Sequence, residues 1–172
     1  MPKTTDFALC EEYLQTVRDL LAHPDVQSMR RFAQHGRVDC LIHCLNVSFA
    51  GYRVCRFLGL NSRAAARGGL LHDFFLYDWH KGNPYKGLHA FTHPRAAAEN
   101  AGRRFEITDR ERDVIAKHMW PLTPRPPRYP ESLVVLIADK IYCVAEAFAP
   151  SELMGARLYR LAREKGLLGA PR

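Results

Sequence analysis

The sequence GGLLHDFFLYDWH, residues 68–80, places His72 and Asp73 side by side at the end of an apolar run. An aspartate is costly to bury without a compensating charge, and a bound metal ion is one way to supply that charge. A metal-binding pair inside a core-forming stretch therefore raises the question of which other polar residues share its environment. The answer decides both the fold and the expected chemistry.

The composition indicates one domain and an anionic partner. The chain has 172 residues, of which 47% are apolar, enough for a single sizeable core. Lys and Arg number 25 against 18 Asp and Glu, and the formal net charge of +7 favours phosphorylated metabolites, nucleotides or nucleic acid. We therefore expect residues 1–172 to form a single domain.

The cysteines and the longest apolar run favour a soluble, cytoplasmic protein with no membrane partner. Five cysteines without a C-x-x-C pair predict neither a disulfide framework nor a thiolate zinc site. The N-terminal residues lack the apolar region of a secretory signal. The run at residues 133–145 is interrupted by Asp139 and Lys140.

Apolar residues recur with helical periodicity along the chain, and strand alternation is almost absent. Gly59 is expected to end a helix, Asn61, Thr92 and Ser151 to cap helices, and TDRE at 108–111 to form a capping box. The pattern predicts an all-α fold, a helical bundle of about seven or eight helices. They are expected at about 6–22, just after Pro24, and at 38–58, 62–75, 92–104, 108–120, 131–148 and 151–166. Residues 77–91 and the proline-rich residues 121–130 are expected to be loops.

Each of five predicted helices carries one metal-type residue or pair. These residues are His43, His72 with Asp73, His93, His118 and Asp139. His43, His118 and Asp139 each share a helix face with apolar residues, which predicts that all three face the core. These apolar neighbours are Cys40, Val47 and Ala50 for His43, Val114 and Ile115 for His118, and Val135, Leu136 and Cys143 for Asp139. A single histidine on such a face is more often a hydrogen-bonded core residue. Six histidines and aspartates spread one or two per helix over five helices favour a metal site instead. Imidazole and carboxylate ligands suit iron, manganese, zinc or cobalt.

The order H…HD…H…H…D, with its flanking GLLHD, the HP at 93–94 and IADK at 137–140, resembles the HD-domain superfamily of metal-dependent phosphohydrolases. The resemblance covers about residues 38–148, with flanking helices on both sides. It implies that His43, His72, Asp73 and Asp139 hold one metal ion. It further implies that His93 and His118 hold a second ion, with Asp73 bridging the two.

The resemblance implies catalytic roles for His72 and Asp73. Two divalent transition-metal ions about 3.5–4 Å apart would activate a bridging water without a protein nucleophile. The sequence departs from the cyclic-dinucleotide phosphodiesterases of this superfamily, because Phe75 and Leu76 replace their Gly-Lys pair and no GYP motif is present.

Phosphate contacts are expected from Lys81, Lys86 and Arg95, of which Arg95 lies two residues after His93. The basic residues Arg157, Arg160, Arg163 and Lys165 indicate a solvated helix face rather than a nucleic-acid surface. The favoured function is hydrolysis of a phosphomonoester or phosphodiester in a small phosphorylated compound. The alternatives are a mixed-valent di-iron oxygenase that cleaves C–C or C–P bonds, and a non-catalytic regulatory module.

Overall fold

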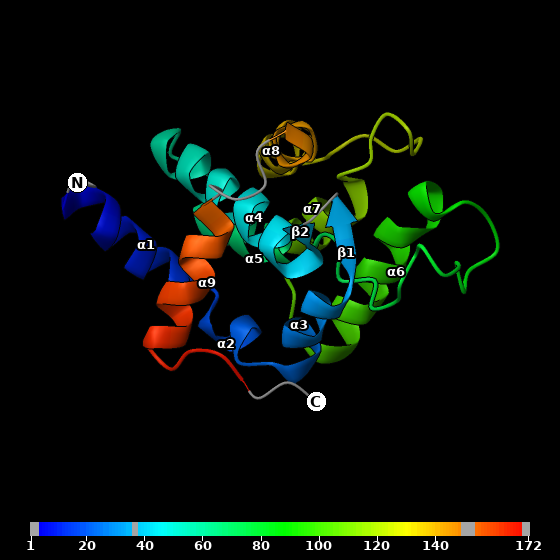
Figure 1. The fold of residues 1–172 in the computed structure, drawn as a ribbon. Helices are drawn as coiled ribbons and strands as arrows, with labels where there is room; N and C mark the ends of the chain where they lie inside the picture. The colour runs from blue at the N-terminus through cyan, green and yellow to red at the C-terminus, as the bar shows by residue number, and fades with distance from the viewer. Residues whose placement is uncertain (1–3, 36–37, 149–153, 170–172) are drawn as a thin grey trace.

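A computed structural model describes residues 4–35, 38–148 and 154–169, and in these ranges the chain is a bundle of α-helices with one short hairpin. The central helix, α4 (Cys40–Phe57), is buried over most of its length. It packs against α5 (Ser62–Leu71), α8 (Pro130–Phe148) and α9 (Met154–Glu164), as Figure 1 shows. The predicted all-α fold is confirmed.

The remaining helices surround this centre. They are α1 (Thr4–Thr16), α2 (Arg18–Leu21), α3 (Pro24–Ser28), the 3₁₀ turn Met29–Arg31, α6 (His89–Arg104) and α7 (Asp109–Lys117). The described residues therefore contain nine α-helices, one more than the expected elements. The extra one arises because the predicted helix 6–22 is interrupted at Val17, whose backbone leaves the helical region at φ −112° and ψ 12°.

Several predicted caps are confirmed. Asn61 accepts a hydrogen bond from the Ala64 amide, and Thr108 and Glu111 form the reciprocal capping box. Gly59 has a φ of +68° where α4 ends, a conformation that favours glycine. The Ser151 cap lies outside the described residues.

The prediction that Thr92 caps a helix is wrong. Helix α6 begins at His89, inside the predicted loop 77–91, and its N-cap residue is Leu88. The Thr92 hydroxyl instead donates its one hydrogen back toward the carbonyls of Leu88 and His89, whose oxygens lie 3.2 and 3.3 Å from Oγ1. A threonine hydroxyl can bond in this way within a helix as well as cap one, so its presence did not locate the boundary.

Two helices end earlier than predicted because an imidazole takes up a terminal carbonyl. Helix α5 stops at Leu71 and α7 at Lys117, so that His72 and His118 are their C-cap residues. The Nδ1 atoms of these histidines donate to the carbonyls of Gly69 and Ile115, each at 2.8 Å. Both imidazoles are thereby fixed against the end of their own helix.

A short hairpin was not predicted. Strand β1 (Ala33–His35) pairs antiparallel with β2 (Val38–Asp39), so α4 begins at Cys40 rather than at residue 38. Asp39 caps α4 by accepting a hydrogen bond from the Ile42 amide. Strands of two or three residues are too short to show an alternating pattern.

The two glycines of the quoted stretch allow α5 to approach its neighbours closely. A Cβ atom on Gly68 would lie 2.7 Å from the Cβ of Val114 on α7, and one on Gly69 would lie 2.9 Å from the Cα of Ser48 on α4. Both distances are too short for real carbon atoms. The absent side chains therefore set the depth at which His72 and Asp73 enter the bundle.

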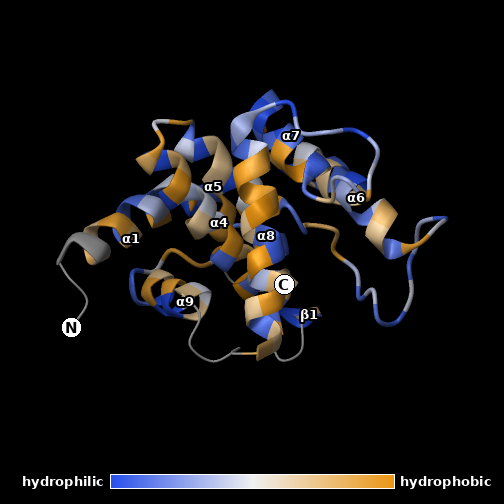
Figure 2. Cartoon of the chain, turned by 90° about the horizontal axis from the view of Figure 1, so that it is seen from above, coloured by the Kyte–Doolittle hydropathy of each residue, from blue (hydrophilic) through white to orange (hydrophobic). Residues whose placement is uncertain are grey.

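Helix α8 reverses the usual surface pattern. Its acidic residues Glu131, Asp139 and Glu146 are buried, whereas Ile137, Ile141 and Val144 are among its exposed side chains. Figure 2 shows how strongly apolar this helix is. Nevertheless, among the described residues no helix is both long and apolar enough to cross a membrane. Buried acids require positive partners, and those of Asp139 and Glu146 lie at the candidate site.

Candidate metal centre

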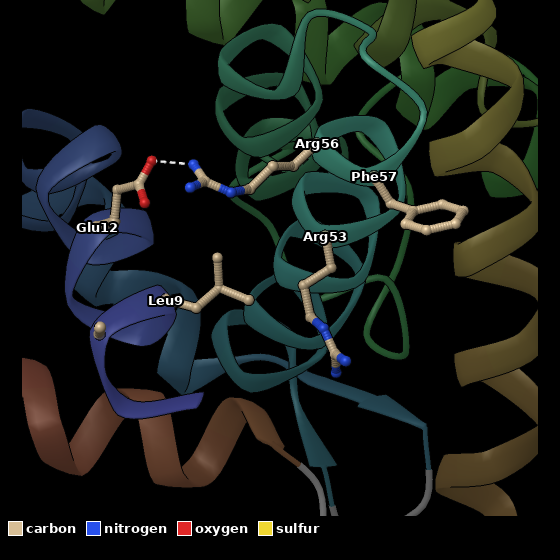
Figure 3. A pocket seen from close by; sticks show the side chains of 6 residues that line it. Leu9, Glu12, Arg53, Arg56 and Phe57 are labelled. Carbon is tan, nitrogen blue, oxygen red and sulfur yellow. Dashed lines mark hydrogen bonds and ion pairs between the residues drawn. The ribbon is translucent and has the colours of Figure 1, made fainter. Parts of the chain in front are cut away.

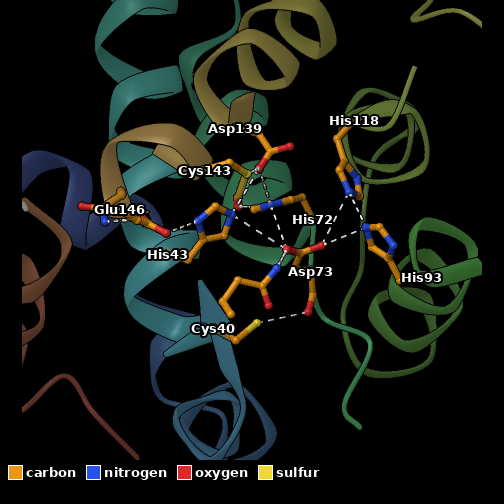
Figure 4. A network of polar contacts seen from close by, with 12 residues as sticks. Cys40, His43, His72, Asp73, His93, His118, Asp139, Cys143 and Glu146 are labelled. Atoms are coloured by element: carbon orange, nitrogen blue, oxygen red, sulfur yellow. Dashed lines mark hydrogen bonds and ion pairs between the residues drawn. The ribbon is translucent and has the colours of Figure 1, made fainter. Parts of the chain in front are cut away.

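The structure brings the six predicted ligand residues together in one buried cluster. His43 comes from α4, His72 and Asp73 follow α5, His93 is on α6, His118 follows α7 and Asp139 is on α8. Each of the six is at most 5% exposed. In Figure 4 Asp73 lies between His93 and His118 on one side and His43 and Asp139 on the other. Residues far apart in sequence thus meet at the dipeptide.

Asp73 faces two sets of imidazole nitrogens with its two oxygens. Its Oδ1 lies 3.3 Å from the Nε2 of His93 and 3.5 Å from the Nε2 of His118. Its Oδ2 lies 3.3 Å from the Nε2 of His72 and 3.8 Å from the Nε2 of His43. One carboxylate therefore joins two halves of the cluster.

We call these the His43 half (His43, His72, Asp139 and Asp73 Oδ2) and the His118 half (His93, His118 and Asp73 Oδ1). In the His43 half, Asp139 Oδ1 lies 3.2 Å from the Nε2 of His43 and 3.6 Å from the Nε2 of His72. The thiol of Cys143 is 3.4 Å from the same oxygen. The His43 half is therefore the richer in carboxylates.

All four imidazoles point Nε2 into the cluster and use Nδ1 elsewhere. The Nδ1 atoms of His72, His93 and His118 donate to the backbone carbonyls of Gly69, His89 and Ile115, at 2.8, 2.9 and 2.8 Å. The Nδ1 of His43 instead donates to the Glu146 carboxylate at 2.8 Å. Because these acceptors take the Nδ1 protons, each Nε2 can coordinate a cation once it carries no proton of its own.

Several atoms that face one another in the cluster would be satisfied by a cation between them. The Nε2 atoms of His93 and His118 are only 2.8 Å apart, a separation that a shared proton or a metal ion between the two nitrogens would satisfy. The buried atoms His72 Nε2 and Asp73 Oδ1 have no hydrogen-bond partner among the described residues. Unsatisfied buried acceptors of this kind are the donor set of a metal ion, so these residues fit the metals expected from the sequence.

The pKa directions show how strongly the cluster attracts positive charge. Burial alone would raise the pKa of Asp73, but His72 and His93 hold that pKa well below its ordinary range. Burial would lower the pKa of His43, but its hydrogen bonds to Asp139 and Glu146 raise it to about 10. Ionised carboxylates thus retain protons on neighbouring imidazoles, and divalent cations would take the place of those protons.

His118 differs from His43 in its electrostatic environment. Burial, together with the charges of His72 and His93, lowers the pKa of His118 to about 3. The imidazole is therefore neutral at physiological pH. A neutral imidazole with a free Nε2 can coordinate a metal ion without first losing a proton.

Two residues that the sequence analysis did not select support the cluster from outside. Gln34, on the unpredicted strand β1, donates its amide to Asp73 Oδ2. Glu146, which is 1% exposed, accepts from His43. The sequence does carry a signal for Glu146, because it lies seven residues after Asp139 on the same face of α8.

A pocket of about 300 Å³ opens over the cluster. It is lined by Gln34, Asp73, Trp79, His89, Ala90, His93, His118, Met119, Asp139, Lys140 and Cys143. Lys140 is the lysine of this lining, and its Nζ atom lies 2.8 Å from Asp139 Oδ2 with the side chain 47% exposed. Trp79 and His89 stack nearly parallel, with their planes 11° apart. The pocket therefore combines the ligand cluster, one amine and an aromatic wall.

The three cationic residues that the sequence analysis proposed for phosphate contact do not line this pocket. Lys81 is 85% exposed and pairs with Asp78, and Lys86 is an exposed loop residue. Arg95 is 86% exposed and pairs with Glu99 on its own helix. Because two residues on a helix are separated by about 200°, Arg95 points away from the cluster that His93 enters.

Pocket volume alone does not identify the site. A pocket of about 500 Å³ lies between α1 and α4, lined by Ala8, Leu9, Glu12, Arg53, Arg56 and Phe57. Figure 3 shows that Arg56 is committed to Glu12 across this pocket. The described residues of its lining include neither histidine nor cysteine. The smaller pocket over the cluster is therefore the candidate site.

No protein-family model, no curated protein and no solved structure matches the chain when it is compared with known proteins.

Proposed function

We propose that this chain is a metal-dependent phosphohydrolase that acts on a small phosphomonoester or phosphodiester with two divalent transition-metal ions. The observation that carries this proposal is the position of Asp73 between two sets of inward-pointing Nε2 atoms, beneath an open pocket. The proposal agrees with the resemblance of the sequence to the HD-domain superfamily.

When bound, the two ions would polarise a phosphoryl oxygen and lower the pKa of a water molecule, which supplies a nucleophile at neutral pH. The side chains of the cluster would hold these ions through Asp73, Asp139 and the four Nε2 atoms. Cys143 is a poor nucleophile, because burial and the neighbouring Asp139 raise the pKa of its thiol. A water nucleophile therefore suits this site better than a protein nucleophile.

Lys140 is the side chain best placed to bind the phosphate group. It lines the pocket, its amine is half-exposed, and its carboxylate partner Asp139 belongs to the cluster. An ammonium group at this position would attract the phosphate as a point charge beside the metal ions. The volume of about 300 Å³ supports a small substrate rather than a nucleic-acid strand.

The activity test uses protein stripped of metal and reloaded separately with manganese, cobalt, iron or zinc. Each form is assayed with p-nitrophenyl phosphate, bis-p-nitrophenyl phosphate and a panel of nucleoside and sugar monophosphates. We expect metal-dependent phosphate release that is lost by several orders of magnitude in His72→Ala and Asp73→Ala. If no phosphate ester is hydrolysed, while the iron form consumes O₂ with a phosphonate or polyol, the oxygenase alternative replaces this proposal.

Substitution of Lys140 tests the phosphate contact. Lys140→Met is expected to raise KM more than it lowers kcat if the amine binds substrate and transition state alike. Lys165→Met is the matched control, because Lys165 also pairs with a carboxylate, that of Glu11, but follows α9, away from the cluster. If Lys81→Met or Arg95→Met raises KM instead, the assignment of Lys140 is wrong.

A further inference from the structure

The His43 imidazole is held at both of its nitrogens by carboxylates of a single helix. Asp139 and Glu146 lie seven residues apart on α8, and therefore on the same helix face. Asp139 Oδ1 is 3.2 Å from Nε2 of His43, and Glu146 Oε2 is 2.8 Å from Nδ1. Figure 4 shows His43 between the two acids.

The second oxygen of Glu146 is fixed as well. Its Oε1 accepts a hydrogen bond of 2.9 Å from the Nδ2 of Asn46, one turn after His43 on α4. The Oδ1 of Asn46 in turn accepts a hydrogen bond of 2.6 Å from the Gly155 amide on α9. A chain of hydrogen bonds therefore joins α9 to the imidazole through a carboxylate that is 1% exposed.

This arrangement distinguishes His43 from the other three histidines. Their Nδ1 atoms donate to neutral backbone carbonyls, whereas His43 donates to an ionisable carboxylate. A carboxylate behind a metal-binding histidine fixes the ring orientation and makes the coordinating nitrogen a stronger donor. The effect belongs to the His43 half, because the two oxygens of Glu146 are bonded to His43 and Asn46.

We infer that Glu146 is a positioning residue that strengthens metal binding in the His43 half through the Nδ1 atom of His43. This inference rests on the metal centre of the proposed function. The inference adds that the protein binds the two ions with different affinities. The contact of Glu146 on α8 with His43 on α4 determines this difference in affinity.

Glu146→Gln is the informative variant because an amide cannot replace both functions of the carboxylate. Its single oxygen can accept from His43 or from Asn46, and its NH₂ group then faces a second donor. Asn46 cannot invert its amide to compensate without losing the bond from Gly155. The matched control is Glu131→Gln, at a position that is also 1% exposed on α8 but contacts Arg110 and the Asn61 amide.

The experiment titrates metal-free protein with zinc in competition with a chromophoric chelator, and circular dichroism checks the fold of each variant. We expect Glu146→Gln to lower the binding affinity for one of the two zinc ions about 10–100-fold and to leave the affinity for the other unchanged. Glu131→Gln is expected to match the wild type. Equal affinities in Glu146→Gln and Glu131→Gln, or equal weakening of both ions, would overturn the inference while leaving the metal centre in place.

NMR of the zinc-loaded wild type provides a second test that needs no variant. The His43 ring should carry its proton on Nδ1, hydrogen-bonded to Glu146, and zinc on Nε2. Zinc on Nδ1 would overturn the inference. If the wild type binds no metal, the metal centre of the proposed function fails, and this inference fails with it.

Discussion

Replacement of Asp73 by asparagine should lower the stability of the fold without metal and should also remove most of the stabilisation that bound metal provides. Without metal, the cluster holds three buried carboxylates, Asp73, Asp139 and Glu146, whose oxygens lie 3.8, 3.2 and 2.8 Å from a ring nitrogen of His43. The substituted asparagine would keep the shape of the side chain and remove one of these charges. Its oxygen can still accept from Gln34, and its NH₂ group would face the Nε2 atoms of His93 and His118, which Asp73 Oδ1 meets at 3.3 and 3.5 Å.

The metal-free variant should therefore be less stable than the metal-free wild type, because His72 stabilises the ionised Asp73 carboxylate in the folded state and the variant leaves that imidazole without this partner. With metal present at about 1,000 times its dissociation constant, a bound ion stabilises the native state by about 4 kcal/mol. For a chain of this size that corresponds to a rise in Tm of about 8–16 °C for one ion, and more for two. Asp73→Asn should lose most of this rise, because the bridging carboxylate serves both halves.

The assay is thermal unfolding of the wild type and Asp73→Asn, each with chelator and with saturating zinc or manganese. Asp78→Asn is the control, because Asp78 lies five residues later and pairs with Lys81 outside the cluster. An equal rise in Tm for Asp73→Asn and the wild type would refute the bridging role. Equal or higher stability of metal-free Asp73→Asn, compared with the metal-free wild type, would refute the argument from buried charge.

Three further predictions address single contacts. His118→Ala should lose one ion by elemental analysis and Asp73→Ala both, because the carboxylate of Asp73 contacts both halves; equal metal contents in the two variants would contradict the assignment. Metal affinity should rise with pH through the neutral range, because His43, with its pKa raised to about 10, must lose its proton when a metal ion binds. Calorimetry in buffers of different ionisation enthalpy should detect the release of at least one proton per chain. If no proton is released, His43 is not protonated in the metal-free cluster and the prediction is wrong. Gly68→Ala should lower the free energy of unfolding, measured in urea, by about 1–3 kcal/mol, because the added Cβ would meet Val114. Gly102→Ala should be tolerated, because its Cβ meets only the end of the flexible Arg112 side chain. Equal stabilities of the two variants would show that α5 and α7 can separate without cost.

Periodicity predicted most of the helices and three residues of the cluster, whereas His72, Asp73 and His93 were selected from the order of the histidines and aspartates and from the family resemblance. Apolar spacing located most of α4, α5, α7 and α8, and the local chemistry of Asn61 and Thr108 identified the caps of α5 and α7. The same spacing oriented His43, His118 and Asp139 toward the core. It also contained the signal for Glu146, although the prediction did not include that residue.

The rest of the candidate site depends on contacts that periodicity does not encode. Gln34 reaches Asp73 from a hairpin too short to recognise in the sequence. Lys140 was treated as an interruption of an apolar run, yet it lines the pocket. Arg95 was favoured for its proximity to His93 in sequence, and the rotation of the helix separates the two side chains. Short distance along the chain is a poor guide to a shared pocket.

The most direct test of the central claim is anomalous diffraction from crystals of the chain loaded with manganese or zinc. The proposed centre predicts two anomalous peaks, one on each side of Asp73, with the first bound by the His43 half and the second by the His118 half. A single peak, or a metal ion located away from these residues, would contradict the account.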